Sequence, residues 1–269
     1  MLERGFNRLR DAILAITYPQ SCHICAGAVE SHDDGVCCQT CWENQSITNL
    51  IDHNPFCAKC GATMPWVSKA LFAAISTSGQ GIPPQTFHCG SCHDLAFTCA
   101  RACGEYKGAL EASILFLKTH PHICKRLRQI LCRAYSRHRD ALHADFVMPV
   151  PLHASRERKR GFNQAAVIAS FLAAEFGLSI DLRSLVRIKD TERHRAGMDA
   201  IDRRKSTEGA FKVVSPDLVR GAAVLLVDDI FTTGSTAASA ARALVTAGAA
   251  RINLLTIARV NRFQVALRF

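Results

Sequence analysis

The segment that constrains the fold most runs from Val224 to Thr236 and reads Val-Leu-Leu-Val-Asp-Asp-Ile-Phe-Thr-Thr-Gly-Ser-Thr. Its four leading apolar residues are typical of a strand buried on both faces, as in parallel sheets covered by helices. Two carboxylates are expected at the end of this strand, followed by a hydroxyl-rich loop with one glycine and an alanine-rich helix from about Ala237. This order predicts an α/β fold.

The loop has the chemistry of a phosphate site. A helix N-terminus offers unpaired N–H groups and the positive end of the helix dipole. Gly234 lets the backbone approach an anion closely. Four hydroxyl side chains surround this glycine: Thr232, Thr233, Ser235 and Thr236. Asp228 and Asp229 suit sugar hydroxyls, or a Mg²⁺ that bridges to a polyphosphate. The segment therefore predicts a site for a phosphorylated ribose.

These thirteen residues resemble the fingerprint of the phosphoribosyltransferase family, which is an apolar strand, two acids and a Thr-Gly-Ser/Thr loop. In that family the acids hold the ribose 2′- and 3′-hydroxyls of phosphoribosyl pyrophosphate (PRPP), and the loop holds its 5′-phosphate. The resemblance implies catalytic roles for Asp228 and Asp229 and phosphate contacts from residues 232–236. Phosphoacceptor receiver domains also end a buried strand with Asp-Asp, but the Thr-Thr-Gly-Ser-Thr run argues against that alternative.

Cysteines are concentrated near the N-terminus, where eleven of the thirteen precede residue 104. Eight of them form four Cys-x-x-Cys pairs: Cys22/Cys25, Cys38/Cys41, Cys57/Cys60 and Cys89/Cys92. Two thiolates at this spacing can bind one ion, and two pairs make a tetrahedral zinc site. The spacing predicts two structural zinc ions. Disulfides are the competing interpretation and would require an exporting compartment.

Sequential pairing would join the first two Cys-x-x-Cys pairs on one ion and the last two on the other, although interleaved pairing stays possible. Cys37 could substitute for Cys38, and three histidines lie beside ligand cysteines and could replace one: His23, His88 and His93. Cys99 and Cys103 are expected on a helix or turn as structural thiols.

The N-terminus argues against export, because the apolar stretch from Ala12 to Ile16 is too short for a signal peptide. No stretch approaches a transmembrane span, and a cytoplasmic protein is expected. Residues 1–20 predict an amphipathic helix that could cover the cysteine module, dock on the second domain or lie on a membrane. The net charge of +10 indicates an anionic partner.

Three units are expected along the chain: the helix at 1–20, a double zinc-ribbon module at 21–99, and an α/β domain at 100–269. Within the last, helices are expected at 110–118, 123–138, 162–176 and 237–246, and strands at 145–150, 224–227 and 252–258. Residues 63–88 are interpreted as an insertion between ligand pairs, because their Ser/Gly/Pro-rich half predicts a loop.

A second motif lies between Val150 and Ala166, where Arg156, Arg158, Lys159 and Arg160 are expected in a loop between a strand and a helix. Loops after the carboxyl ends of parallel strands are where α/β proteins bind ligands. These cations could hold a pyrophosphate. Asn163 and Gln164 could hydrogen-bond a ribose or base. A solvated basic loop is the alternative.

Taken together, the motifs resemble the ComF family over nearly the whole chain. That family has a cysteine-rich ribbon followed by Tyr-x-Gly, Pro-Val-Pro-Leu, Arg-Gly-Phe-Asn-Gln and the phosphoribosyl fingerprint. Here the middle three motifs are Tyr106–Gly108, Pro149–Leu152 and Arg160–Gln164. The resemblance implies a type I phosphoribosyltransferase-like parallel sheet flanked by helices, with Mg²⁺ accompanying PRPP. It also implies that the PRPP site includes Pro151, Leu152, Arg156, Lys159 and Arg160.

The chain departs from this family at two places. The family usually carries Thr-x-x-Gln before the last two strands, but the matching run here is Thr191-Glu-Arg-His194. It also tends to have Arg-x-x-x-Asn, whereas this chain has Arg203 or Arg204 and then Ser206. These positions are expected to border the site, so the departures put the ligand preference in doubt.

The same resemblance implies a role in natural competence, the inward transport of single-stranded DNA, with partners such as a helicase. Residues 118–160 carry eleven Lys/Arg against three acids, and this basic stretch predicts electrostatic binding of single strands. The expected contacts are Lys118, Lys125, Arg126, Arg128 and Arg158. The alternative is an active phosphoribosyltransferase of nucleotide metabolism, for which no acceptor motif or N-terminal glutaminase cysteine is found.

Overall fold

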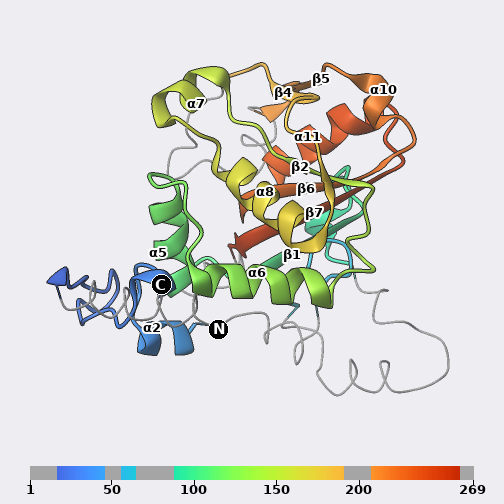
Figure 1. The fold of residues 1–269 in the computed structure, drawn as a ribbon. Helices are drawn as coiled ribbons and strands as arrows, with labels where there is room; N and C mark the ends of the chain where they lie inside the picture. Colours follow the sequence, from blue (N-terminus) through green and yellow to red (C-terminus); the bar gives the residue numbers. More distant parts are fainter. Residues whose placement is uncertain (1–16, 46–55, 65–87, 191–206, 261–269) are drawn as a thin grey trace.

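A computed structural model describes residues 17–45, 56–64, 88–190 and 207–260 (Figure 1). Residues 1–16 of the predicted N-terminal helix, residues 65–87 of the insertion predicted at 63–88, and the family departures at Thr191–His194 and 203–206 lie outside the described residues. None of the described helices is long and apolar enough to cross a bilayer.

The central element is a five-stranded parallel sheet with the order β1-β7-β6-β2-β3. Its strands are β1 (Cys99–Glu105), β2 (Phe146–Pro149), β3 (Ser179–Ile180), β6 (Ala223–Phe231) and β7 (Arg251–Arg259). The four residues 224–227 of β6 are fully buried because the strand lies between β7 and β2 and is covered on both faces. The α/β fold predicted from this segment is confirmed.

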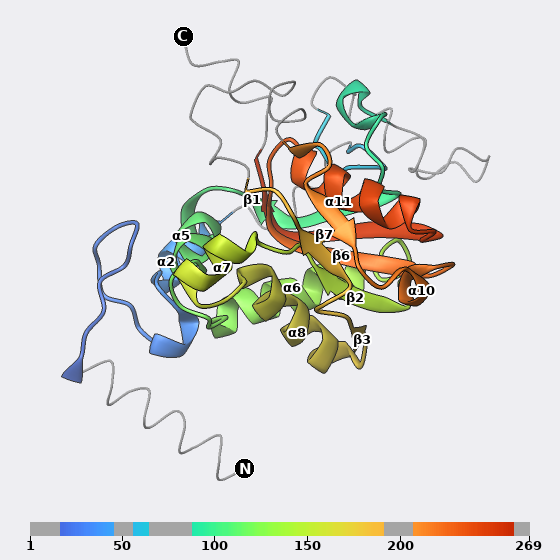
Figure 2. The ribbon, with the colours of Figure 1, turned by 90° about the horizontal axis from the view of Figure 1, so that it is seen from above.

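Helices cover both faces of the sheet (Figures 1 and 2). The first face packs on α5 (Gly108–Leu117), α6 (Lys125–Arg137) and α8 (Gln164–Phe176). The second packs on α11 (Ser235–Thr246). Alternate residues of β6 divide between the two cores: Leu225 and Val227 belong to the first, Val224 and Leu226 to the second. This is the period of two that a strand buried on both faces requires.

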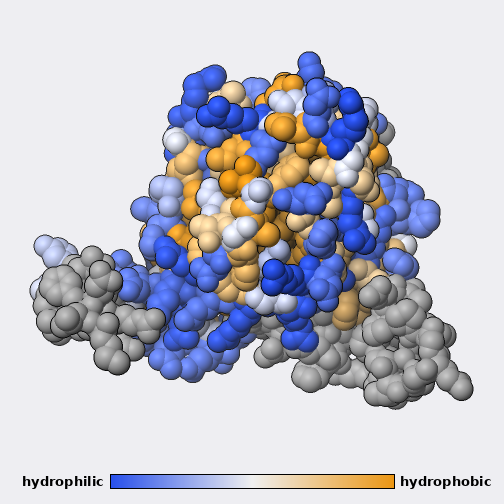
Figure 3. All heavy atoms as spheres, turned by 45° about the vertical axis from the view of Figure 1, so that its right-hand side comes forward, coloured by the Kyte–Doolittle hydropathy of each residue, from blue (hydrophilic) through white to orange (hydrophobic). Residues whose placement is uncertain are grey.

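Shorter elements complete the described fold. They are η1 (His32–Asp34), α2 (Gln39–Glu43), η3 (Gly90–Cys92), α7 (Ala154–Arg160), α10 (Pro216–Val219) and an antiparallel pair, β4 (Leu185–Arg187) with β5 (Phe211–Val213). In Figure 3, apolar atoms gather at the centre of the visible face and polar side chains surround them.

The two cysteine-rich segments lie on opposite faces of the sheet. Cys22, Cys38 and Trp42 pack in the core with α5 and α6, whereas Cys57 and Cys92 pack in the core with α11. Figure 2 shows the two segments at different sides of the sheet. The cysteine module predicted at 21–99 and the domain predicted at 100–269 therefore share both cores, and the boundary at 99 stays a prediction.

Three local expectations were wrong. Cys99 and Cys103 lie on strand β1, because parallel pairing with β7 makes this stretch an edge of the sheet. The basic loop is largely the helix α7, which His153 caps by accepting a hydrogen bond from the Ser155 amide and Gly161 ends in the left-handed conformation. Strand β6 continues beyond Val227 to Phe231, so the two aspartates lie within it and not after it.

Candidate functional site

A cleft of about 1210 Å³ opens at the carboxyl ends of β6 and β2. It brings together the basic motif at 150–166 and the aspartate and hydroxyl motif at 224–236, which are about seventy residues apart in the sequence. Its lining residues are Leu115, Lys118, Thr119, Val150, Pro151, Leu152, Arg156, Lys159, Arg160, Gln164, Arg187, Asp190, Asp228, Asp229, Ile230, Thr232 and Thr236. The cleft therefore joins an acidic pair, hydroxyl groups and five lysines or arginines.

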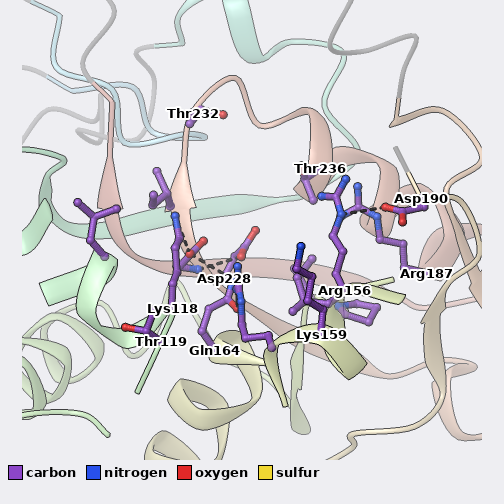
Figure 4. Close-up of a pocket in the computed structure, with 17 residues that line it drawn as sticks. Lys118, Thr119, Arg156, Lys159, Gln164, Arg187, Asp190, Asp228, Thr232 and Thr236 are labelled. Carbon is purple, nitrogen blue, oxygen red and sulfur yellow. Dashed lines mark hydrogen bonds and ion pairs between the residues drawn. The ribbon is translucent and has the colours of Figure 1, made fainter. Parts of the chain in front are cut away.

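Asp229 is buried and held by two side chains from the first face of the sheet. Gln164, the first residue of α8, donates from Nε2 to the Asp229 carboxylate at 3.3 Å, and Lys118 Nζ lies 3.7 Å from the same oxygen. Gln164 also accepts a hydrogen bond from Arg160. Figure 4 shows Lys118 and Gln164 on the same side of the cleft as Asp228. Lys118, assigned to nucleic acid from the sequence, thus lies in this cleft.

Asp228 is half-buried on the adjacent position of β6 and accepts a hydrogen bond from the Asp229 amide at 2.9 Å. Burial, followed by the neighbouring charge of Asp229, raises the pKa of Asp228 well above its ordinary value. A cation or a hydroxyl donor bound next to Asp228 in the cleft would favour the ionised form of the Asp228 carboxyl. Two adjacent carboxylates that open on a cleft are suitable ligands for sugar hydroxyls or Mg²⁺.

The phosphate loop, residues 232–236, connects β6 to α11. Gly234 has a φ of 77° at the N-cap of α11, a conformation that favours glycine. Thr232 and Thr236 line the cleft. Thr233 and the buried Ser235 instead bond each other, with 2.5 Å between their hydroxyl oxygens, and Thr233 also accepts from the Ser235 amide at 3.2 Å. Two of the four predicted hydroxyls therefore shape the loop, and two face the cleft.

The basic wall of the cleft comes from α7 and from the end of β4, with Asp190 three residues beyond it. Arg156 Nε lies 2.8 Å from the Asp190 carboxylate, and the Ser155 hydroxyl donates to the same carboxylate at 2.5 Å. The Ser155 bond, together with Arg156 and His153, lowers the pKa of Asp190 despite partial desolvation. Burial and the charge of Arg156 lower the pKa of Arg187. Figure 4 shows Arg156, Arg187 and Asp190 grouped together.

Three polar lining residues, Arg187, Asp190 and Thr119, were not singled out from the sequence. Arg187 of β4 forms a backbone bridge with His153 just before α7, which brings Arg187 and Asp190 beside Arg156, and no motif marks that stretch. Asn163 was considered a ligand contact, but it caps α8: its side chain accepts from the Ala165 amide at 3.0 Å and donates to the Val150 carbonyl at 3.1 Å.

The predicted nucleic-acid residues do not form one surface. Lys118 lines the cleft, and Arg158 is exposed on α7. Lys125 and Arg126 lie at the start of α6, 3.9 Å and 3.5 Å from the Asp34 carboxylate. Arg128 lies on α6 over the ring of Phe171, 5.8 Å from its centre.

Two groups of four cysteines have the geometry of metal centres. One is Cys22, Cys25, Cys38 and Cys41, and the other is Cys57, Cys60, Cys89 and Cys92, with the four sulfurs of each within 4.8 Å of one another. The two groups match sequential pairing of the Cys-x-x-Cys motifs. Sulfur atoms of a tetrahedral zinc site lie about 3.8 Å apart, and separations of 3.4–3.6 Å occur here. The residues fit zinc.

Neighbouring thiols and imidazoles lie outside both groups. Cys37 is fully buried, and burial together with the charge of Cys22 raises the pKa of its thiol to about 12. Burial also raises the pKa of Cys22, but hydrogen bonds from the Cys25 and Cys38 amides outweigh this and lower it to about 6. By position, Cys22 belongs to the first group of four, whereas Cys37 lies outside it. His93 is exposed and bonds Asp94 at 3.0 Å.

Comparison with known proteins places these features among relatives. The model of the phosphoribosyl transferase domain matches residues 163–267. DNA utilization protein YhgH of Salmonella typhi is 33% identical over 115 residues, which cover 43% of this chain and 49% of that protein. The chain thus spans about half the length of this relative.

Two further matches extend the comparison. Competence protein F of Haemophilus influenzae is 26% identical over 247 residues, which cover 88% of this chain and 96% of that protein. A solved structure of glutamine phosphoribosylpyrophosphate amidotransferase from B. subtilis, complexed with ADP and GMP, has a TM-score of 0.32 and 22% identity over 48% of this chain and 25% of that chain. At that score the structural likeness carries no conclusion.

We predict that the chain binds two zinc ions and that replacing one ligand removes one of them. Cys38→Ser should lower the zinc content to one ion per chain. Cys37→Ser is the matched control and should retain two, because the neighbouring Cys37 thiol lies outside the group. Elemental analysis of the purified proteins measures this, and loss of an ion from the Cys37 variant would show that the ligand is wrongly assigned.

A second prediction concerns the ionisation of Asp228. Because its pKa is raised in the folded state, the stabilisation from the protonated carboxyl is present at low pH and is lost as the pH rises through the folded-state value. Asp228→Asn should therefore stabilise the ligand-free protein, and its gain should grow between about pH 5 and about pH 8. Urea unfolding measures the free energy, with the exposed Asp217→Asn as control. An equal gain at both pH values would contradict the raised pKa.

Proposed function

The chain belongs to the ComF family, and from that premise we propose that its cleft binds PRPP with Mg²⁺ and that the protein acts in natural competence. The observation that carries the ligand proposal is a single cleft lined by the aspartate pair, the hydroxyl loop and the basic wall. PRPP has a 5′-phosphate, a ribose diol and a pyrophosphate. The three parts of the cleft have the complementary chemistry, in one continuous space.

The phosphate loop is proposed to receive the 5′-phosphate. It offers the hydroxyls of Thr232 and Thr236 together with the N-terminal end of the twelve-residue helix α11. Backbone N–H groups and the helix dipole at such an end favour an anion. The closed Thr233–Ser235 hydroxyl pair holds the loop in this shape before any ligand arrives, which lowers the entropy cost of binding.

Asp228 and Asp229 are proposed to accept hydrogen bonds from the ribose 2′- and 3′-hydroxyls. Gln164 and Lys118 fix the Asp229 carboxylate, so the acceptor is oriented in advance. Mg²⁺, when bound with the pyrophosphate, would neutralise part of its charge.

The basic wall is proposed to receive the pyrophosphate. Arg156, Lys159, Arg160 and Arg187 line this side of the cleft. Arg156 is already ion-paired to Asp190, so its guanidinium is held in place, while Lys159 is exposed and adaptable. Pro151 and Leu152 lie between this wall and the strand end and complete the floor.

Work in DNA uptake would need a second surface for single strands, and α6 is proposed to supply it. Exposed cations recur along this helix at Lys125, Arg128, Arg133 and Arg137. A groove of about 590 Å³ beside them is lined by three of these cations, by His122 and Phe171, and by two acids, Asp33 and Glu175. Cations along a groove with an aromatic ring are the features that bind single strands without sequence preference.

The proposal includes a cytoplasmic location and leaves phosphoribosyl transfer as the alternative activity. Zinc-bound thiolates fit the reducing cytoplasm, where uptake partners such as a helicase would meet the incoming strand. An active phosphoribosyltransferase with an unidentified acceptor is the alternative function. Pyrophosphate release that a particular base or amine stimulates would favour this alternative, because binding alone releases none.

We expect calorimetric titration to detect PRPP with Mg²⁺ binding to the zinc-loaded protein. The Asp228→Asn/Asp229→Asn double variant should lose measurable binding, because both diol acceptors lose their charge. Asp217→Asn, whose side chain is 86% exposed on α10, is the matched control and should bind as the wild type does. No heat with a folded, zinc-loaded wild type would reject PRPP as the ligand.

The DNA surface predicts a change in salt dependence. Arg128→Gln/Arg133→Gln should weaken binding of a single-stranded oligonucleotide and reduce the slope of log K against log salt by about 1.4, because each phosphate that is no longer neutralised lowers the slope by roughly 0.7. Arg183→Gln/Lys212→Gln removes two exposed cations elsewhere and serves as the charge-matched control. Equal slopes for both double variants would show that α6 is not the strand site.

A further inference from the structure

We propose that the second metal centre, Cys57, Cys60, Cys89 and Cys92, holds the phosphate loop in its binding shape, so that the anion end of the cleft depends on this zinc and not on the first one. The cysteines of the second centre therefore act as positioning residues for the loop. The consequence for PRPP rests on the proposed function, but the effect on the loop itself does not.

The first observation is that the loop and the second metal centre face each other across almost no space. A cavity of about 30 Å³ lies between them. One side is formed by Cys60, Ala62, Cys89, Ser91, Cys92 and Leu95, and the other by Phe231, Thr232, Thr233 and Arg259. A space of this size holds about one water molecule. Three ligand cysteines thus share a wall with the inner side of the loop.

The second observation is a direct contact at Gly234. A Cβ atom at this position would lie 2.7 Å from Phe231 Cζ and 3.1 Å from Leu95 Cδ1, so the loop backbone is packed tightly on both side chains. Leu95 is buried, and its amide donates to the Cys92 carbonyl at 3.2 Å. The ligand Cys92 is therefore connected to the loop glycine through a single residue.

A third observation joins the centre to the base of the loop. Arg259, the last residue of β7, donates a hydrogen bond to the Cys60 carbonyl. Its guanidinium also lies over the ring of Phe231, 5.3 Å from the ring centre. Phe231 is the last residue of β6, and its carbonyl accepts from the Val260 amide at 2.9 Å. Arg259 thus binds the metal segment and the strand that leads into the loop.

The first metal centre has a different position. Its cysteines pack in the core with α5 and α6, and none of the four is among the described residues that line the cleft or the small cavity. Gln45, close behind it in the chain, accepts a hydrogen bond from the Leu110 amide of α5 at 3.3 Å. Loss of this centre should loosen α5 and α6 and leave the loop unchanged.

In this proposal, the bound zinc is the source of the stabilisation that the second centre gives to the phosphate loop. In a small structural site, the binding energy of the metal is folding energy for the segments that supply its ligands. The described parts of those segments are short, 56–64 and 88–98, and their regular structure is a single turn of 3-10 helix, η3. Without the ion, four buried thiols would lose their common partner, and Leu95 would lose the support that presses it on Gly234.

Hydrogen exchange followed by mass spectrometry tests the proposal on the full chain. Peptides that cover residues 228–240 should exchange about tenfold faster in Cys89→Ser/Cys92→Ser than in the wild type, because the loop opens more often. Cys22→Ser/Cys25→Ser is the matched control: it also loses one zinc, but faster exchange is expected in α5 and α6 only. Unchanged exchange of the loop peptides in the first variant would overturn the proposal.

A second variant tests the connection between the second metal centre and the phosphate loop even if the cysteine variant does not fold. Leu95→Ala leaves all eight ligands in place and removes the side chain that packs on Gly234. It should retain two zinc ions and still show faster exchange of the loop peptides. Two bound ions with wild-type exchange of the loop would contradict the proposed connection.

Titration of PRPP with Mg²⁺ into the same proteins separates this proposal from the function on which it builds. If the wild type does not bind, the proposed function fails, while the exchange data still decide whether the second centre holds the loop. If the wild type binds and Leu95→Ala binds equally well with a wild-type loop, the proposed function stands and the connection fails. Weaker binding by Leu95→Ala, with two ions retained, supports both.

Discussion

The parallel pairing of β6 between β7 and β2 is the constraint on which the rest of the structure depends. Because β6 is buried on both faces, its side chains alternate between two cores, and its polar side chains lie at the carboxyl-terminal edge of the sheet, where β6 continues beyond its last pair with β2. Asp228 and Asp229 stand at that edge, one on each side of the strand. Asp229 meets Gln164 and Lys118 from the first face, and the loop that follows enters α11 on the second face.

The two cysteine groups extend this division, since each joins a different core. The first lies with α5, the helix that carries the chain to Lys118, and the second lies beneath the phosphate loop. The regular structure in the described parts of these cysteine-rich segments is limited to η1, α2 and η3. Metal binding would supply the folding energy that such short segments lack, and it would do so next to the two sides of the cleft.

Features that are encoded locally could be predicted from the sequence. The apolar run of β6, the glycine loop and the Cys-x-x-Cys pairs each predict their structure from a few neighbouring residues. Prediction failed where contacts between residues far apart in the sequence determine the local structure. Strand β1 exists because β7 pairs with it, and Arg187 joins the cleft because its backbone bridge with His153 brings it beside Arg156. Helix α7 depends on a histidine cap that no common pattern marks. The division of the cysteine groups between two faces depends on the whole sheet.

A crystal structure of the zinc-loaded protein with PRPP and Mg²⁺ tests the proposed binding mode most directly, because it shows the position of each part of the ligand. We expect the 5′-phosphate at residues 232–236, the ribose diol at Asp228 and Asp229, and the pyrophosphate beside Arg156 and Arg187. A ligand bound in another part of the molecule, or in this cleft with its phosphate away from the loop, would contradict this binding mode.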